Sequence, residues 1–157
     1  MNNGTYLLTL LCLHVMGLVL MAGTTFVDYI AFSNIWNLLD RRKEKPEGLL
    51  QVTARFSRLI GIGAAILILT GLGMMALTKG VFGEQLWFRI KFGLVIILVA
   101  NGVIVGRRHG LKFRKLLDNG FELSPQIMQS RSSLNRFYII QLAIFITIII
   151  LSVFKFN

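Results

Sequence analysis

Four apolar stretches, separated by polar segments, make up most of this chain. Each stretch holds about 18 residues or more, enough for a helix to cross the roughly 30 Å hydrocarbon core of a bilayer. A backbone in lipid has to satisfy its own hydrogen bonds, so the stretches are expected to be helical. With polar extensions, the expected helices run from about 5 to 42, 46 to 78, 86 to 108 and 125 to 155.

Composition supports a membrane protein and excludes several other classes. Of the 157 residues, 55% are hydrophobic and 15% charged, whereas a soluble domain carries about a quarter charged residues. The same values exclude a disordered chain. The single cysteine, Cys12, excludes an internal disulfide framework and a Cys-x-x-Cys metal motif. We therefore expect one all-α membrane domain that comprises residues 1–157.

Basic residues predict the orientation of the helices. Most of the 17 Lys and Arg residues lie in the segments that join the first stretch to the second and the third to the fourth. Positively charged loops stay in the cytoplasm, so both termini are expected outside, in the manner of a multi-pass protein of the bacterial inner membrane. The net charge of +10 is attributed to this topology and to attraction to anionic membrane lipid. No nucleic-acid partner is expected.

Residues at the helix ends predict helices that are longer than the bilayer is thick. Pro46 suits the first position of the second helix, and Ser124 with Pro125 suits the start of the fourth. Residues 110–118 intersperse apolar side chains with lysine and arginine, which is typical of a short interfacial helix. The expected fold is an up-down bundle of four transmembrane helices that extends into the cytoplasm.

Three polar side chains fall at a similar depth in the outer half of the expected bundle. Counted from the outer ends of their helices, His14 lies roughly 14 Å deep, Thr70 roughly 12 Å and Lys91 roughly 8 Å. The long stem of Lys91 lets its ammonium group lean along the helix axis. Ionisable residues are costly inside a membrane, which makes them functional candidates. His14 and Lys91 are therefore the predicted catalytic residues, with Thr70 beside them.

His14 has two interpretations. A neutral imidazole in an apolar bundle can ligate haem iron or copper, or relay protons. Alternatively, it makes one interhelical hydrogen bond and holds no ligand. A second axial ligand to a metal would be a methionine, Lys91, water or the His14 of a second copy, because His109 lies at the opposite end of the third helix.

Two basic residues near the outer end of the third helix also have two interpretations. Arg89 and Lys91 can bind an anionic group, such as a haem propionate or a lipid phosphate. Alternatively, their side chains extend to the headgroups and bind no specific ligand.

Two further contacts are expected closer to the cytoplasm. Asn101 and Gln141 fall at one level and are expected to hydrogen-bond across the third and fourth helices. Asp28 is expected to form an ion pair with Arg55 or Arg58, which enter the second helix at a similar height.

Small residues suggest close contacts between helices, and methionines suggest a path for copper. Gly102 and Gly106 permit close helix approach and are expected to support a homo-oligomer, and the pair Gly61 and Ala65 permits a similar approach. Copper handling is a further hypothesis. It depends on four of the methionines, Met16, Met21, Met74 and Met75.

Parts of the sequence resemble known membrane families. The segment LHVMGLVLMAG is similar to the opening of the copper-resistance D membrane domain and of a group of uncharacterised integral membrane proteins. ARFSRLIGIGAAILILTGLGMMAL followed by LWFRIKFGLVIILVANG resembles the four-helix protoporphyrinogen oxidase of bacterial haem synthesis. The resemblance implies a haem b cofactor and a functional pair, His14 and Lys91. The chain departs from it at Met21, where these families have Trp, and at Asn101, where the oxidase has His.

Two classes of function follow. One is a haem- or porphyrin-associated redox protein, which as an enzyme would be an oxidoreductase resembling protoporphyrinogen oxidase. In it His14 ligates the metal, and Lys91, Thr70 and Arg89 complete the cofactor site. The other is a non-enzymatic scaffold, assembly subunit or small transport protein without a cofactor.

Overall fold

The described secondary structure is helical. The computed structural model describes residues 3–42, 46–81, 85–106, 108, 110–112, 115 and 125–154. Its elements are α1 (Asn3–Arg42), α2 (Glu47–Leu77), α3 (Leu86–Ala100), the π-helical η1 (Asn101–Gly106) and α5 (Pro125–Phe154). Because these ranges contain no strand, the all-α class is confirmed for them. The expected interfacial helix at 110–118 lies largely outside the described residues, as do His109 and Ser124.

Among the residues that the structure describes, three helices are long and apolar enough to cross a membrane. These are α1 with 40 residues, α2 with 31 and α5 with 30, and their bounds are close to those expected. Pro46 lies just before α2 rather than at its first position. The third expected helix is divided, because α3 has only 15 residues and passes directly into the six residues of η1.

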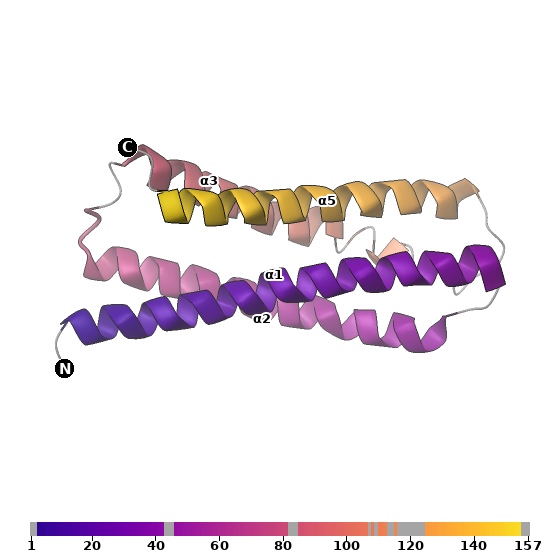
Figure 1. Cartoon of the computed structure of the whole chain (residues 1–157), viewed down its shortest axis with the longest axis horizontal. Coiled ribbons are helices and arrows are strands. Elements are labelled where there is room, and N and C mark those ends of the chain that lie inside the picture. Colours follow the sequence, from indigo (N-terminus) through magenta and orange to yellow (C-terminus); the bar gives the residue numbers. More distant parts are fainter. Residues whose placement is uncertain are drawn as a thin grey trace.

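The helices form two antiparallel pairs (Figure 1). α1 packs along α2, α3 packs along α5, and the two pairs meet mainly where α1 touches α5. α1 and α3 begin, and α2 and α5 end, at one end of the molecule, which we call the termini end. The opposite end, where α2 and α5 begin, is called the loop end.

Two glycines set the place where α1 crosses α2. A Cβ atom on Gly63 would lie 2.9 Å from the backbone nitrogen of Met21 and 3.0 Å from the carbonyl oxygen of Gly17. Such an approach of two backbones requires the absence of a side chain. The expected contact through Gly61 and Ala65 is therefore wrong within this chain, because both are exposed and a Cβ on Gly61 would meet nothing within 4 Å. Gly61 lies about 200° around the helix from Gly63.

Buried apolar side chains form two clusters that hold the pairs together. The middle cluster joins α1, α3 and α5 and consists of Met21, Leu98, Phe145 and Ile148. The loop-end cluster joins α1 to α5 and consists of Phe32, Ile35, Trp36, Leu39, Ile127, Leu134 and Tyr138. Because lipid is as apolar as these side chains, close packing rather than a hydrophobic driving force stabilises such contacts in a membrane.

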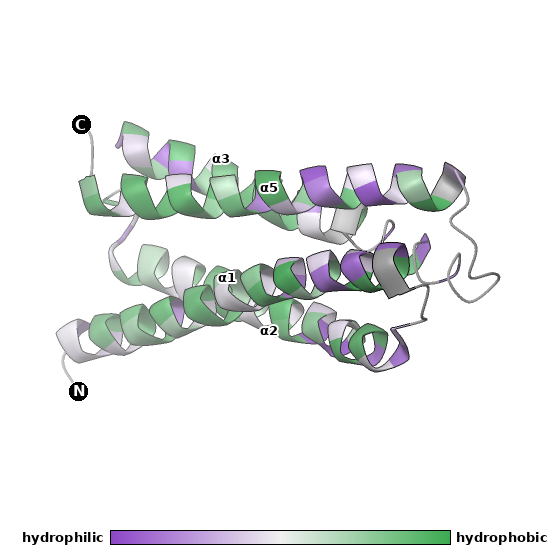
Figure 2. Cartoon of the chain, turned by 45° about the vertical axis from the view of Figure 1, so that its right-hand side comes forward, coloured by the Kyte–Doolittle hydropathy of each residue, from purple (hydrophilic) through white to green (hydrophobic). Residues whose placement is uncertain are grey.

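The outer surface of the helices is apolar along most of its length. Only 11%, 11% and 22% of the apolar windows of α1, α2 and α5 are buried inside the structure. Figure 2 shows that hydrophilic turns gather towards the loop end of α1, α2 and α5. An apolar surface this extensive would be unstable in water but suits contact with acyl chains. The chain therefore has the surface and the helix lengths of a multi-pass membrane protein.

Candidate functional site

A hydrogen bond between α1 and α2 lies at the centre of the candidate site. The Nδ1 atom of His14 is 2.9 Å from the Oγ1 atom of Thr70. Thr70 is buried and His14 is half-buried. The structure thus brings together two of the residues that the depth argument placed at a similar level, although they are 56 positions apart in the chain.

The direction of this hydrogen bond follows from the other contacts of Thr70. Its hydroxyl lies 2.6 Å from the carbonyl oxygen of Ile66, one helical turn earlier, and donates its single proton there. The oxygen of Thr70 is then an acceptor for His14. The Nδ1 atom of His14 carries the ring proton and donates it, which leaves the Nε2 atom with a free lone pair.

One edge of the imidazole lies against α2, and the Nε2 atom is the ring nitrogen that makes no hydrogen bond with Thr70. A Cβ atom on Gly71 would lie 3.6 Å from Cε1 of His14 and 4.0 Å from Nδ1, so this edge of the ring lies against α2. The backbone carbonyl of Leu67, also on α2, is a further hydrogen-bond partner of the ring. In the tautomer in which Nδ1 donates to Thr70, Nε2 is the atom of His14 that can bind a metal ion or accept a proton.

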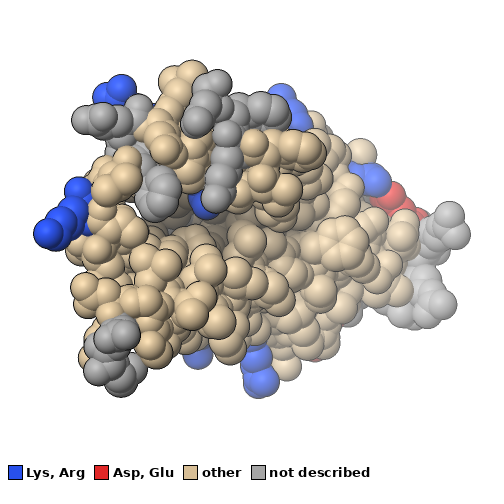
Figure 3. Space-filling model, turned by 60° about the vertical axis from the view of Figure 1, so that its left-hand side comes forward, with Lys and Arg blue, Asp and Glu red and all other residues tan. Residues whose placement is uncertain are grey.

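Lys91 of α3 brings a positive charge to the same region. It is half-buried and lies close enough to His14 for its charge to act on the ring. The acidic residues that the structure describes are Asp28, Asp40 and Glu47, and none of them forms an ion pair with Lys91. The charge of Lys91 is therefore available to an anionic group from outside the described chain. Figure 3 views the molecule from the side of the termini end and shows a hollow in this face, with basic atoms at its edge.

Arg89 does not join His14 and Lys91. Its side chain is exposed, and two positions of helix turn it about 200° away from Lys91. Its predicted place in a cofactor site is thus not supported by its orientation.

The four methionines of the copper hypothesis lie in different surroundings. Met21 is buried in the middle cluster, whereas Met16 and Met75 are exposed and Met74 is half-buried. In addition, no group of three or more His, Cys, Asp or Glu side chains in the described ranges is arranged to hold a metal ion. A metal at His14 would therefore have to bring most of its own ligands, as the iron of a haem does.

A second polar pair lies deeper, between α5 and the junction of α3 with η1. Asn101 Nδ2 donates to Gln141 Oε1 at 2.8 Å, which confirms the hydrogen bond expected from the sequence. Gln141 Nε2 in turn donates to the Leu98 carbonyl at 3.2 Å. A Cβ on Gly102 would lie 3.6 Å from the same Nε2 atom, so Gly102 faces α5 of its own chain. Its predicted role with Gly106 in a homo-oligomer stays a prediction.

Asp28 has a partner that the sequence reasoning missed. Tyr138 of α5 donates its hydroxyl proton to Asp28 Oδ2 at 2.8 Å. The expected partners Arg55 and Arg58 are exposed on α2. The tyrosine was a detectable signal, because a phenol at the end of an apolar stretch commonly supplies a hydrogen bond at the membrane boundary.

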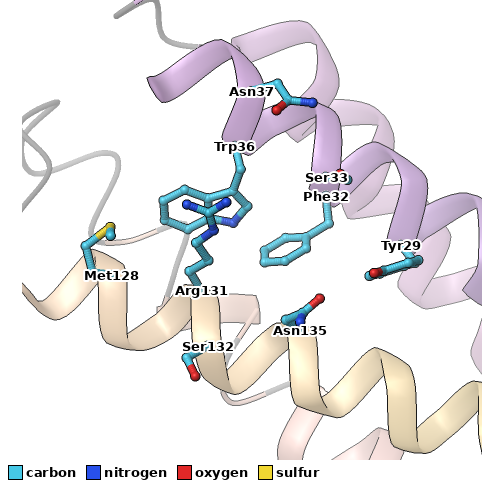
Figure 4. A pocket seen from close by; sticks show the side chains of 9 residues that line it. All are labelled: Tyr29, Phe32, Ser33, Trp36, Asn37, Met128, Arg131, Ser132 and Asn135. Atoms are coloured by element: carbon cyan, nitrogen blue, oxygen red, sulfur yellow. The ribbon is translucent and has the colours of Figure 1, made fainter. Parts of the chain in front are cut away.

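The structure also contains a groove between α1 and α5 that was not expected. It has a volume of about 390 Å³ and lies towards the loop end. Figure 4 shows Arg131 reaching from α5 to the ring of Trp36, with Phe32 between the helices. Arg131 Nη1 lies 3.2 Å from Asp40 Oδ2, and its Cζ lies 5.0 Å from the centroid of Trp36.

Comparison with known proteins adds no family to this description. No family model, curated protein or solved structure matches the chain.

Proposed function

We propose that the chain spans the bacterial inner membrane four times, with both termini outside. The fourth span in this proposal is α3 together with η1. The two segments are continuous, and their combined length of about 30 Å matches the hydrocarbon core. Placement of the loop end in the cytoplasm is supported by the basic residues concentrated in the connecting segments.

We further propose that the termini end binds a haem or a related porphyrin, whose metal His14 would hold through Nε2. One observation carries this proposal: the hydrogen bond to Thr70 fixes the ring and leaves Nε2 with its lone pair free. Metal-binding histidines characteristically donate their other ring nitrogen to an oxygen acceptor in this way. The resemblance to the haem-synthesis oxidase independently favours the same residue.

The residues present fit such a group in their chemistry. Thr70 orients the imidazole, and Lys91 supplies a cation that can pair with a propionate carboxylate in an apolar environment. Bound haem would supply one-electron or oxygen chemistry, which on this proposal makes the chain an oxidoreductase similar to protoporphyrinogen oxidase.

The alternative is a scaffold, assembly subunit or small transport protein without a cofactor. It is favoured by the observation that no group of three or more His, Cys, Asp or Glu side chains in the described ranges could hold a metal ion. In that case the bond from His14 to Thr70 would only join α1 to α2.

An absorption spectrum discriminates between these functions. The protein is produced with haem precursor supplied, purified in mild detergent and measured from 350 to 650 nm. The proposal predicts a Soret band and about one haem per chain. A purified, folded protein with no Soret band would overturn the haem proposal and favour the alternative.

Two variants, each of which removes one positive charge from α3, test the role of Lys91. Lys91→Met removes the cation near His14 and is expected to weaken haem retention about tenfold or more, as loss of a charged partner does. Arg89→Met removes an exposed cation on the same helix and is expected to leave retention unchanged. Equal retention by the two variants would exclude Lys91 from the site.

A further inference from the structure

The groove between α1 and α5 lies just beyond the apolar part of both helices. In α1 no Asp, Glu, Lys or Arg precedes Asp28, and the residues that line the groove begin at Tyr29. In α5 the uncharged apolar stretch begins at Phe137, and Arg131 lies about 9 Å further towards the loop end. A membrane that covers the apolar stretches therefore places the groove at the level of the lipid headgroups.

Hydrogen-bond donors and an apolar surface line the groove together. Arg131 stands at one side, while Tyr29 and Asn135 point into the space beside Phe32 (Figure 4). The complete lining is Tyr29, Phe32, Ser33, Trp36, Asn37, Met128, Arg131, Ser132 and Asn135. A molecule with a polar head and an apolar tail matches this combination of surfaces.

Arg131 is held in place but retains free donors. Its Nη1 atom makes a single contact of 3.2 Å with Asp40, and its guanidinium lies over the ring of Trp36. A guanidinium has five N–H donors, so most of them stay available to an oxyanion. The contacts with Asp40 and Trp36 reduce the conformational freedom that Arg131 would lose on binding.

The charges favour an anionic headgroup over a zwitterionic one. A choline group is recognised by open aromatic faces, but the nearest face of Trp36 is occupied by Arg131. Asp40, the acidic residue next to the groove, is paired with the same arginine. A phosphodiester without a cationic group matches the remaining donors and the net charge of +10.

We propose that the groove between α1 and α5 is a binding site for an anionic phospholipid. The phosphodiester contacts Arg131 with support from Tyr29 and Asn135, and the start of one acyl chain lies along Phe32. The volume of about 390 Å³ accommodates a headgroup together with the start of a chain. This site is independent of the proposed haem site, which lies in the outer half of the bundle.

Quenching of Trp36 by brominated lipids tests the proposal. The Trp87→Phe variant leaves Trp36 as the only tryptophan, since the chain has two. It is reconstituted in vesicles of dioleoyl phosphatidylcholine or phosphatidylglycerol mixed with their dibromo forms. Trp36 is expected to show a binding constant about fivefold higher for phosphatidylglycerol, the factor expected of one basic side chain near an anionic surface. Equal constants for the two lipids would overturn the proposal.

Two arginine variants and one reporter control identify the site. In the same background, Arg131→Gln is expected to abolish the preference, whereas Arg136→Gln, an exposed arginine outside the groove, is expected to retain it. In a Trp36→Phe chain, Trp87 is expected to report no preference, because it lies at the termini end. A preference that survives Arg131→Gln, or that Trp87 reports equally, would mean general attraction to the membrane and contradict the site.

Two further measurements keep the test decisive. Inorganic phosphate at constant ionic strength is expected to leave the lipid preference unchanged. Displacement by phosphate would instead identify a site for the free anion and overturn the lipid assignment.

If the tryptophan variants do not fold, native mass spectrometry of Arg131→Gln and Arg136→Gln replaces quenching. Loss of retained phosphatidylglycerol in Arg131→Gln alone supports the proposal, and equal retention contradicts it.

Discussion

The Nδ1 atom of His14 donates to the Oγ1 atom of Thr70 across 2.9 Å, and the Thr70 hydroxyl donates a hydrogen bond to the carbonyl oxygen of Ile66. This chain of two bonds fixes both the position and the tautomer of the imidazole. It also ties the candidate site to the contact between α1 and α2. The same contact is set by Gly17 and Gly63, whose backbones meet 3.0 to 3.2 Å from the Cβ positions that they lack.

Thr70→Val tests whether the hydrogen bond serves a ligand. Valine retains the shape of threonine but cannot accept from His14, so haem affinity is expected to fall about 10- to 100-fold, as for other second-shell partners of metal ligands. The measurement is a haem titration followed at the Soret band. Thr147→Val is the matched control, because Thr147 is exposed and also bonds to a carbonyl of its own helix. Equal affinities of the two variants would contradict the role of Thr70.

Gly63→Ala tests the crossing of α1 and α2. The new Cβ would lie 2.9 Å from the backbone of Met21, and overpacking of this kind costs about 1–3 kcal/mol. Gly61→Ala is the control, since its Cβ would meet nothing within 4 Å. Thermal unfolding in detergent is expected to show a lower midpoint for Gly63→Ala alone. A midpoint for Gly63→Ala at or above that of Gly61→Ala would refute the crossing.

Gln141→Leu tests the polar pair in the membrane. It leaves the Asn101 amide without the acceptor seen at 2.8 Å, and such pairs contribute about 0.6–1.7 kcal/mol in membranes. The double variant with Asn101→Leu is expected to recover part of that loss, because neither polar group is then left unpaired. Reversible unfolding in mixed micelles measures the free energy of unfolding of the wild type, of the two single variants and of the double variant. Strictly additive losses from the two substitutions would show that the two amides are not coupled.

Cysteine labelling tests the proposed topology. In a Cys12→Ala background, Lys79→Cys lies at the termini end and Glu47→Cys at the loop end, and both side chains are exposed. A maleimide that cannot cross the membrane is expected to label Lys79→Cys in intact cells, but Glu47→Cys only after lysis. The reverse pattern would place the termini in the cytoplasm, and labelling of both in intact cells would exclude a membrane between them.

Much of the fold could be predicted because lipid imposes one structure on an apolar stretch. Helix lengths followed from the apolar blocks, and the levels of His14 and Thr70 followed from a fixed rise per residue. The bond from Asn101 to Gln141 followed from the same count, since two amides at one depth have few other partners.

What the sequence could not give was the rotation of each helix about its axis. Gly61 and Gly63 have similar neighbours in the sequence, and only the packing shows that Gly63 faces α1. The change to π-helix at Asn101 was hidden for a similar reason. There Gln141, distant in the chain, donates to the Leu98 carbonyl at the end of α3. Arg89 and Lys91 likewise differ only by the side of α3 that they occupy.

The absorption spectrum of His14→Ala, recorded before and after addition of imidazole, tests whether His14 binds the haem. Removal of the side chain is expected to abolish the Soret band. Free imidazole is then expected to restore it by occupying the space beside Thr70. His109→Ala, which replaces the other histidine of the chain, is expected to keep the wild-type spectrum throughout. A Soret band in untreated His14→Ala equal to that of the wild type would contradict the account.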